Sequence, residues 1–581
     1  MYKISLIGFE ICTLHNIQLI QIAVVLTLAF GFTSVSCYKD EAQTELSTDV
    51  KHRGASLPSG GTFIDVTHKA GIKFIHSEYP DEFLAVGAGV VIFDFNGDRL
   101  NDIFLPNSDG PNFLYKNNGD STFIEVAKQS QLDDPLGRGN GGCVADYDND
   151  GDQDMYATNY GGSKLYNNSG DGTFHDVTER AGLLPNREDL RDTGCSWGDY
   201  NLDGNIDLVV TRHIPDPDVE LLFQRVQVTA VGGVSLFSNL GNGTFIDATP
   251  LLGNSITPRT GMYDINRGNV WGAGFQPGWI DLDNDHDPDL YVVNDMGDRV
   301  QPNVLWRNDG LGENDIWQFS DISEISGAGT RIDGMALAVG DYNLDGNLDL
   351  FMTDIGTNVL LENSGDGLTF TDKTEEAEVG VGNIGIRDRV TWGAMFFDYD
   401  NDGLEDLYVV SGHLRIRGFT DNSNYEFEQP NVLLKNTGNS KFKNVSLESG
   451  ADDAGVGRGG AFFDYNNDGC LDIFVVNYGQ QAKLFQNQCI YNNNWIMLHL
   501  EGTLSNKNGI GARVEVTTGE VTQIREISGG SSHMGQNMPE AHFGIGNHKI
   551  IDSIKVMWPS GHTQLISLSS VNKKILVKEA E

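Results

Sequence analysis

The sequence predicts an all-β fold: a seven-bladed β-propeller followed by a small β-sandwich-like domain. An aspartate-rich motif recurs seven times between residues 94 and 472, and each copy precedes a short apolar run. Most copies are followed by a second run that ends in an Asn-Gly or Gly-Asp-Gly turn, which is typical of β-hairpins. A repeat of about 60 residues has room for four short strands, and seven such units favour a closed propeller over an open solenoid.

Acidic residues dominate the charge of the chain. Among 581 residues, 82 are Asp or Glu and 39 are Lys or Arg, so the formal net charge is −43. This charge argues against a nucleic-acid partner, because nucleic-acid binding requires a basic surface. So many carboxylates would repel one another and oppose compaction unless counterions lie close to them.

The repeated motif has the form Asp-x-Asp/Asn-x-Asp-x-x-x-Asp. In a tight loop, side chains at positions 1, 3, 5 and 9 can converge while the carbonyl of position 7 fills a gap, and this all-oxygen cage suits calcium. Hard oxygen ligands disfavour zinc or copper. We therefore expect up to seven Ca²⁺ sites. In loop order, the expected ligands are Asp94, Asn96, Asp98 and Asp102; Asp146, Asp148, Asp150, Asp152 and Asp154; Asp199, Asn201, Asp203 and Asp207; Asp281, Asp283, Asp285, Asp287 and Asp289; Asp341, Asn343, Asp345 and Asp349; Asp398, Asp400, Asp402 and Asp406; Asp464, Asn466, Asp468 and Asp472.

Position 3 of the motif alternates between Asn and Asp along the chain. The odd-numbered loops have Asn there and the even-numbered loops, two, four and six, have Asp. The even loops therefore offer one more carboxylate to an ion, and we expect them to bind calcium more tightly. Loop four is irregular, because His286 and Pro288 stand where the turn usually takes Gly and a flexible residue.

A strand-four signature predicts how the ring closes. It occurs at Thr62–Thr67 (TFIDVT), ahead of the first loop, and then once after each of loops one to six, but not after loop seven. We expect the N-terminal strand to complete the last blade, which would remove an exposed sheet edge.

These repeats resemble the FG-GAP/VCBS propellers of integrin α-subunits, and the whole of residues 60 to 575 resembles the cartilage acidic protein family with its UnbV/ASPIC C-terminal domain. The C-terminal resemblance rests on Asn494-Trp495, GIGARVEV from Gly509, SGGSS from Ser528, HFGIG from His542 and WPSG from Trp558. It implies a secreted, calcium-binding protein whose biochemical activity is unassigned. The alternating runs ARVEV and SIKVMW independently predict half-buried strands.

We divide the chain into a signal peptide (1–37), a flexible linker (38–61), the propeller (62–491) and a UnbV/ASPIC-like β domain (492–581). The apolar stretch 22–32 is too short for a transmembrane helix and suits a signal-peptide core. The run ending at Cys37 resembles a lipobox, so a lipid anchor at Cys37 and simple cleavage are both open. Either way we expect a secreted or outer-surface protein, and a monomer. Cys143 and Cys195 precede comparable aspartate clusters; we favour buried free thiols over a bridge.

Long insertions at 211–234, 250–270 and 412–430 are expected on the face opposite the calcium loops. Loops on a rigid scaffold often carry binding sites. Arginines that precede the first strands of several repeats are expected on the same face, near the central channel, where they could grip an anion or pair with carboxylates of neighbouring blades. The candidate ligand-binding residues are Arg138, Arg267, Arg331, Arg389 and Arg458, with His213 and His413.

We predict an adhesion or recognition module that binds an extracellular glycan or protein ligand. We assign no catalytic residue, because Gly194–Gly198 fits the nucleophile-elbow pattern only formally and leads into a calcium loop. One alternative is a calcium-dependent polysaccharide lyase that uses His213, His413 or Tyr425. The other is a non-catalytic scaffold for polymer capture at the cell surface.

Overall fold

The computed structural model describes residues 62–580 except 78–85, 184–190, 215–231, 254–271, 313–314, 366–368, 383–387, 415–426 and 569. The expected signal peptide, the linker, Cys37, Arg267, Tyr425 and most of the three insertions lie outside the described residues. All described residues belong to one compact unit, Pro58–Glu581. Within them, no helix combines the length and the apolar character that crossing a membrane requires.

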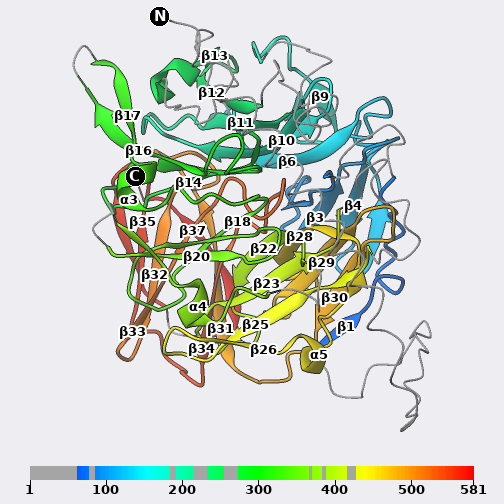
Figure 1. Cartoon of the computed structure of the whole chain (residues 1–581), viewed down its shortest axis with the longest axis vertical. Coiled ribbons are helices and arrows are strands. Elements are labelled where there is room, and N and C mark those ends of the chain that lie inside the picture. The colour runs from blue at the N-terminus through cyan, green and yellow to red at the C-terminus, as the bar shows by residue number, and fades with distance from the viewer. Residues whose placement is uncertain are drawn as a thin grey trace, which may run out of the picture. The chain divides into compact units, whose positions relative to one another are not determined.

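Seven four-stranded antiparallel sheets, one per loop, account for the repeats in the described residues, which confirms the all-β prediction (Figure 1). We number the sheets after their loops. They contain β2 (Val91–Phe93), β3 (Asp102–Leu105), β4 (Phe113–Asn117) and β5 (Phe123–Glu125); β6 (Gly139–Ala145), β7 (Asp154–Asn159), β8 (Lys164–Asn168) and β9 (Phe174–Asp176); β10 (Arg191–Gly198), β11 (Asp207–His213), β12 (Gly233–Asn239) and β13 (Phe245–Asp247); β14 (Gly274–Ile280), β15 (Asp289–Asn294), β16 (Val304–Leu311) and β17 (Trp317–Asp321); β18 (Leu337–Gly340), β19 (Asp349–Met352), β20 (Val359–Asn363) and β21 (Phe370–Asp372); β22 (Thr391–Phe397), β23 (Asp406–Ser411), β25 (Val432–Asn436) and β26 (Phe442–Asn444); β28 (Gly457–Phe463), β29 (Asp472–Asn477), β30 (Lys483–Asn487) and β1 (Phe63–Asp65).

The burial of each strand follows from its place in its sheet. The second strands, such as β7 and β15, are buried at every residue, because neighbouring sheets cover both of their faces. Most fourth strands, such as β9 and β13, bury only the leading Phe and expose the next two side chains. An apolar run with no polar alternation therefore marks an inner strand, and a single aromatic marks the outer one.

The N-terminal strand completes sheet seven, as the sequence predicts. β1 pairs antiparallel with β30, with Phe63 opposite Asn487 and Asp65 opposite Phe485 (Figure 1). The first strands of the sheets also contact one another in chain order, from β2 through β6, β10, β14, β18 and β22 to β28, and β28 contacts β2. Each inner strand therefore has a neighbour on both sides.

The C-terminal domain is built from two sheets. The order in one is β34 (Ala541–Gly546), β31 (Asn494–Glu501) and β37 (Lys573–Lys578), and in the other β33 (Val521–Glu526), β32 (Arg513–Thr518), β35 (Ser553–Met557) and β36 (Thr563–Ile566). Apolar side chains of both sheets, including Leu498, Val514 and Val556, belong to one buried cluster. The remaining elements are short: η1 (Thr249–Leu252), α3 (Ser323–Ser326), α4 (Thr374–Ala377), α5 (Ser446–Ser449) and the pair β24 (Gln429–Pro430) and β27 (Ala454–Gly455).

A segment of the C-terminal domain, Ser528–Asn537, lies among the first strands of the repeat sheets. We call it the channel segment. It bonds β10 through Trp197 N to Gly529 O (3.0 Å), and β18 through Ser532 N to Leu337 O (2.9 Å). A Cβ at Gly89 or Gly141 would lie only 2.0 or 2.1 Å from Met534 O, so the segment requires glycine at both positions. The chain itself therefore enters the space between these strands, and a cavity of about 120 Å³ remains beside the segment.

The preference for free thiols at Cys143 and Cys195 is wrong, because these two residues form a disulfide. Cys470 and Cys489 form a second disulfide. Cys143 lies on β6 and Cys195 on β10, and these first strands are neighbours, so their Cα atoms lie 5.9 Å apart despite 52 residues of sequence separation. The second bridge ties position 7 of loop seven to the residue that follows β30 by two positions.

Candidate metal centres

Two backbone hydrogen bonds hold the position-1 aspartate in six of the seven loops, and loop four has the first of them, from Asp285 N to Asp281 Oδ1 (3.1 Å). In loop two, Asp146 Oδ1 accepts from Asp150 N (3.0 Å) and Oδ2 from Gly151 N (2.7 Å). The residue at position 6 adopts a left-handed φ in all seven loops, and it is Gly in five of them. His286 takes this position in loop four with φ 80°. Loop four therefore keeps the common backbone despite its unusual sequence.

The aspartate at position 9 begins the second strand and is fully enclosed. Asp102 accepts hydrogen bonds from Phe95 N (3.2 Å) and Asn117 N (2.6 Å), and six of the seven equivalent residues repeat both bonds. Burial raises the pKa of Asp102 to about 8 and that of Asp349 to about 9, although hydrogen bonds from Asn117 and Asn363 oppose the shift. These carboxylates therefore lack a compensating positive charge in the protein chain alone.

The even loops gather their carboxylates most closely. Among the described residues, three aspartate groups each bring their oxygens within 4.8 Å of one another, and they lie in loops two, four and six: Asp146, Asp148 and Asp154; Asp281, Asp283 and Asp285; Asp398, Asp400 and Asp406. The position-3 oxygens, Oδ1 of Asp148, Asp283 and Asp400, are buried without a hydrogen-bond partner. Oxygen donors with unsatisfied lone pairs fit a hard cation such as calcium.

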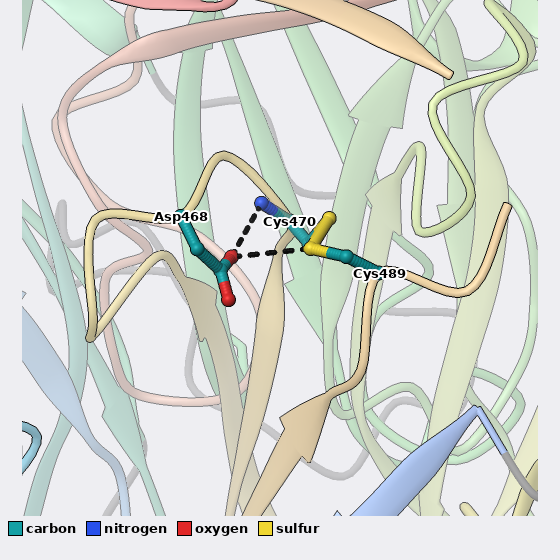
Figure 2. Close-up of side chains that lie close together, drawn as sticks. All are labelled: Asp468, Cys470 and Cys489. Atoms are coloured by element: carbon teal, nitrogen blue, oxygen red, sulfur yellow. Dashed lines mark hydrogen bonds between the residues drawn. A yellow bond between two sulfur atoms is a disulfide. The ribbon is translucent and has the colours of Figure 1, made fainter. Parts of the chain in front are cut away.

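A fourth group, Asp468, Cys470 and Cys489, is not a metal centre of this kind (Figure 2). The two sulfur atoms are joined in the disulfide, so neither is a thiolate that could bind a metal. Asp468 Oδ1 instead accepts a hydrogen bond from Cys470 N (3.0 Å), within loop seven.

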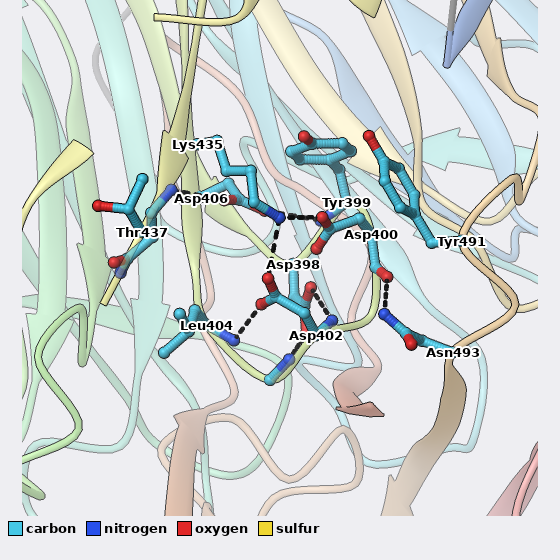
Figure 3. Close-up of polar contacts among 12 residues, drawn as sticks. Asp398, Tyr399, Asp400, Asp402, Leu404, Asp406, Lys435, Thr437, Tyr491 and Asn493 are labelled. Atoms are coloured by element: carbon cyan, nitrogen blue, oxygen red, sulfur yellow. Dashed lines mark hydrogen bonds and ion pairs between the residues drawn. The ribbon is translucent and has the colours of Figure 1, made fainter. Parts of the chain in front are cut away.

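Loop six contains an internal cation (Figure 3). Lys435, on β25, places its ammonium between Asp400 and Asp402, with Nζ 2.9 Å from Asp402 Oδ2. Burial alone would lower the pKa of Lys435, but hydrogen bonds to the two carboxylates raise it above its ordinary value. In loop two the equivalent side chain is the neutral Asn167, which donates to Asp148 Oδ2 (2.9 Å). Loops two and six therefore differ in charge although their aspartates match.

Replacing Lys435 with Met is expected to increase the calcium affinity of loop six. The ammonium and a calcium ion would compete for the same two carboxylates, so removing it should tighten the calcium site of loop six in calorimetry. The matched control is Lys164→Met, since Lys164 lies on the third strand of sheet two but pairs with Asp134 (2.7 Å), outside any loop. Equal stoichiometry and affinity in wild type and Lys435→Met would show that the lysine does not compete.

A set of seven buried asparagines, which the sequence analysis missed, joins each sheet to its neighbour. Each ends a third strand or lies near its end and donates from Nδ2 to the position-2 carbonyl of the adjacent loop. The bond from Asn117 to Tyr465 O (2.8 Å) links sheet one to loop seven and completes the cycle. The set is Asn117, Asn168, Asn239, Asn308, Asn363, Asn436 and Asn487. The sequence signal of this set is an Asn near the end of the third strand of each repeat.

The C-terminal domain contacts the candidate calcium loops directly. Asn508 Oδ1 accepts from Asp146 N in loop two (2.6 Å), and Arg513 Nη2 donates to Asp281 O in loop four (2.7 Å). In loop six, Asn401 O accepts from Gly546 N (2.8 Å). All three even loops therefore lie against this domain, and their backbone geometry is coupled to its position.

The candidate residues of the opposite face have their own contacts. His213 bonds Asp295 Oδ2 (3.1 Å) through Nε2 and Ile214 O (3.0 Å) through Nδ1, and His413 Nδ1 lies 3.0 Å from Leu414 O. Arg458 is fully buried, donates to Gly412 O and Gly457 O, and lies 4.1 Å from the Trp392 ring.

The other arginines differ in exposure. Arg138 lies 3.9 Å from the Tyr160 ring, Arg389 bonds Ser411 and the Pro430 carbonyl, and Arg331 is exposed. In the described part of the chain, the channel segment lies among the first strands, so these arginines do not surround a channel free of protein. Ligand binding by them stays a prediction.

Two families match the chain. The FG-GAP-like repeat matches residues 94–157, 146–210, 281–352 and 341–409, and the family described as ASPIC and UnbV matches residues 502–581. Cartilage acidic protein 1 of Xenopus tropicalis is 23% identical over 511 residues, which cover 83% of this chain and 72% of that protein. The Mus musculus protein is 23% identical over 521 residues, which cover 85% and 73%.

Solved structures give weaker likenesses. The BP39L lectin from Burkholderia pseudomallei matches with a TM-score of 0.41 and 11% identity, covering 69% of this chain and 96% of the lectin. A Bacillus licheniformis rhamnogalacturonan lyase matches with a TM-score of 0.34 and 13% identity, covering 73% and 75%.

Proposed function

This chain carries FG-GAP-like repeats and a UnbV/ASPIC domain and is homologous to cartilage acidic protein 1 over most of its length; from this premise we propose that it is a calcium-stabilised extracellular recognition module. The observation that carries the proposal is the set of carboxylate clusters in loops two, four and six, each with a buried position-3 oxygen that lacks a partner. A bound cation would supply that partner. In the rigid propeller-like scaffold, surface loops and grooves are then available for a glycan or protein ligand.

An extracellular or outer-surface location is supported by the two disulfides, because such bridges form and persist in oxidising compartments and are rare in the cytosol. The net charge of −43 also suits a calcium-rich environment, in which bound ions offset the carboxylates. Secretion and a lipid anchor at Cys37 remain two forms of this proposal.

The lyase alternative receives no support from His213. Both ring nitrogens of His213 have partners, Asp295 and the Ile214 carbonyl, and its side chain is buried. A residue held this way is better suited to structure than to proton transfer.

The calcium part of the proposal is tested by counting bound ions in the purified protein and in two matched variants. Asp148→Ala removes a position-3 carboxylate and is expected to remove one tight site, whereas Asn201→Ala removes a neutral position-3 amide of loop three and should leave the tight sites unchanged. Calorimetric titration gives both number and affinity. Identical titrations of wild type and Asp148→Ala would contradict calcium binding in loop two.

A further inference from the structure

A groove of about 470 Å³ lies where loops six and seven meet the start of the C-terminal domain. Tyr399 and Asp400 of loop six and Asp468 of loop seven form part of its wall, and the segment Tyr491–Trp495 forms another part. Its volume lies in the range of small-molecule sites in proteins. None of the residues proposed above for the insertion face contributes to it.

An aromatic side chain is held open to solvent at this groove. Tyr491 is 43% exposed. Among the large exposed hydrophobic residues of the described chain, it is the only aromatic one. Its ring lies edge-on to the buried Tyr399 ring, with centroids 6.0 Å apart (Figure 3). A tyrosine offers both an apolar face and a polar tip, a combination found at ligand-binding surfaces.

The rest of the lining is rich in amides. Asn467, Asn492, Asn493, Asn494 and Asn572 line the groove, and an amide can make up to four hydrogen bonds. Asn494 and Asn572 already bond each other (2.8 Å), and the Asn493 amide nitrogen donates to Asp400 O, so part of this hydrogen-bonding capacity holds the groove together and the rest is left for a ligand. Asn401 also lines it and is 3% exposed; its Nδ2 donates to Gly469 O (3.1 Å), but its Oδ1 has no partner. A buried acceptor without a donor is costly, and a ligand hydroxyl could supply that donor.

The groove is fixed before any ligand arrives. The Cys470–Cys489 disulfide anchors the chain two residues ahead of Tyr491 to loop seven (Figure 2). Asn493 Nδ2 donates to Asp400 O (2.8 Å), and the Trp495 ring packs on Gly469 so closely that a Cβ there would overlap it. A rigid site loses little conformational entropy on binding.

We propose that this groove binds an uncharged glycan, with the apolar face of a sugar ring on Tyr491 and its hydroxyls on the asparagine amides. The inference rests on the proposed recognition function and deepens it by naming the site and the ligand class. Amides and an aromatic face match a molecule with many hydroxyls and apolar C–H faces. Among the described residues that line the groove there is no Lys or Arg to pair with a carboxylate, and the chain has a net charge of −43, so the groove favours uncharged over acidic sugars.

The experiment uses the full chain with calcium on an array of neutral gluco-, manno- and galacto-oligosaccharides and of uronate-bearing oligosaccharides. We expect retention of neutral chains. Tyr491→Ala should weaken the best interaction about tenfold, which corresponds to about 1.4 kcal/mol, whereas Tyr491→Phe keeps the ring and should bind like wild type. Leu565→Ala, at a residue 72% exposed outside the groove, is the control. Melting temperatures of all variants should agree.

The possible results distinguish a failure of the groove proposal from a failure of the proposed recognition function. Neutral glycans retained equally by wild type and Tyr491→Ala would overturn the groove while leaving glycan recognition standing. Retention of uronate-bearing chains alone would overturn the proposal that the ligand is uncharged. No retention of any oligosaccharide would overturn this inference, and the recognition function would then depend on a protein ligand and on the calcium titration described above.

Discussion

Removing calcium with a chelator at pH 8 is expected to lower the melting temperature of this protein by on the order of 10 °C, because several loops lose a stabilising ion at once. Each emptied loop leaves carboxylates within 4.8 Å of one another in loops two, four and six. Ions that bind only the folded state stabilise it by mass action, and the loops belong to sheets that contact one another in a closed cycle. The loss should therefore be cooperative.

The difference in melting temperature between the calcium-loaded and the chelated protein should increase with pH. In the calcium-free protein, burial raises the folded-state pKa of Asp102 to about 8, above its ordinary value of 3.8. Such a group favours folding while it is protonated, so this stability is present below about pH 4 and is lost as the pH rises through 8. Calcium requires the ionised carboxylates, so the gap between loaded and chelated melting temperatures should widen from pH 5 to pH 8.

Scanning calorimetry at several pH values measures both effects. Magnesium added at the same concentration is the control, because it prefers small octahedral sites with several water ligands and should restore less stability. Coincident melting of the calcium-saturated and chelated protein at pH 8 would rule out a structural role for the ion.

The second large effect is expected from Asn239→Ala, which should destabilise the protein by about 2–4 kcal/mol. Asn239 Nδ2 donates to Tyr147 O in loop two (2.7 Å) and to Ile206 O in its own loop (3.0 Å), and its Oδ1 accepts from Gly241 N (3.0 Å). Asn239 is 2% exposed, so alanine would remove the donor of the buried Tyr147 and Ile206 carbonyls. Chemical denaturation measures the change in unfolding free energy.

Asn242→Ala is the matched control, because this asparagine lies three residues later on an exposed turn and bonds only Thr244 in the described structure (3.1 Å from Thr244 N). Its effect should stay within about 0.5–1 kcal/mol. If the two variants have the same unfolding free energy, the seven buried asparagines do not stabilise the packing of adjacent sheets.

The features that the sequence predicted well are those encoded over a few residues. The nine-residue loop motif carries its own spacing, so position 1, position 9 and the turn between them could be located without a structure. The alternation at position 3 singled out loops two, four and six, and in these loops three aspartate oxygens lie within 4.8 Å of one another. Tighter calcium binding by these loops stays a prediction. The early TFIDVT strand predicted the pairing of β1 with β30, because a count of signatures requires no knowledge of contacts.

Long-range partners could not be predicted in the same way. Asn239 is visible in the sequence, but its bond to Tyr147 spans 92 residues and exists only because adjacent sheets pack. Lys435 enters loop six from another strand, and Ser528–Asn537 reaches the first strands from the C-terminal domain.

The sequence by itself determined the all-β class, the seven aspartate-rich loops and the strand that closes the last sheet, because hydrophobic period and turn chemistry act between near neighbours. Only the tertiary structure decided that Cys143 and Cys195 form a disulfide, that Ser528–Asn537 lies among the first strands and that Tyr491 is exposed at a groove. These depend on how sheets far apart in the sequence pack, where burial and steric fit select among many arrangements that the local pattern allows equally.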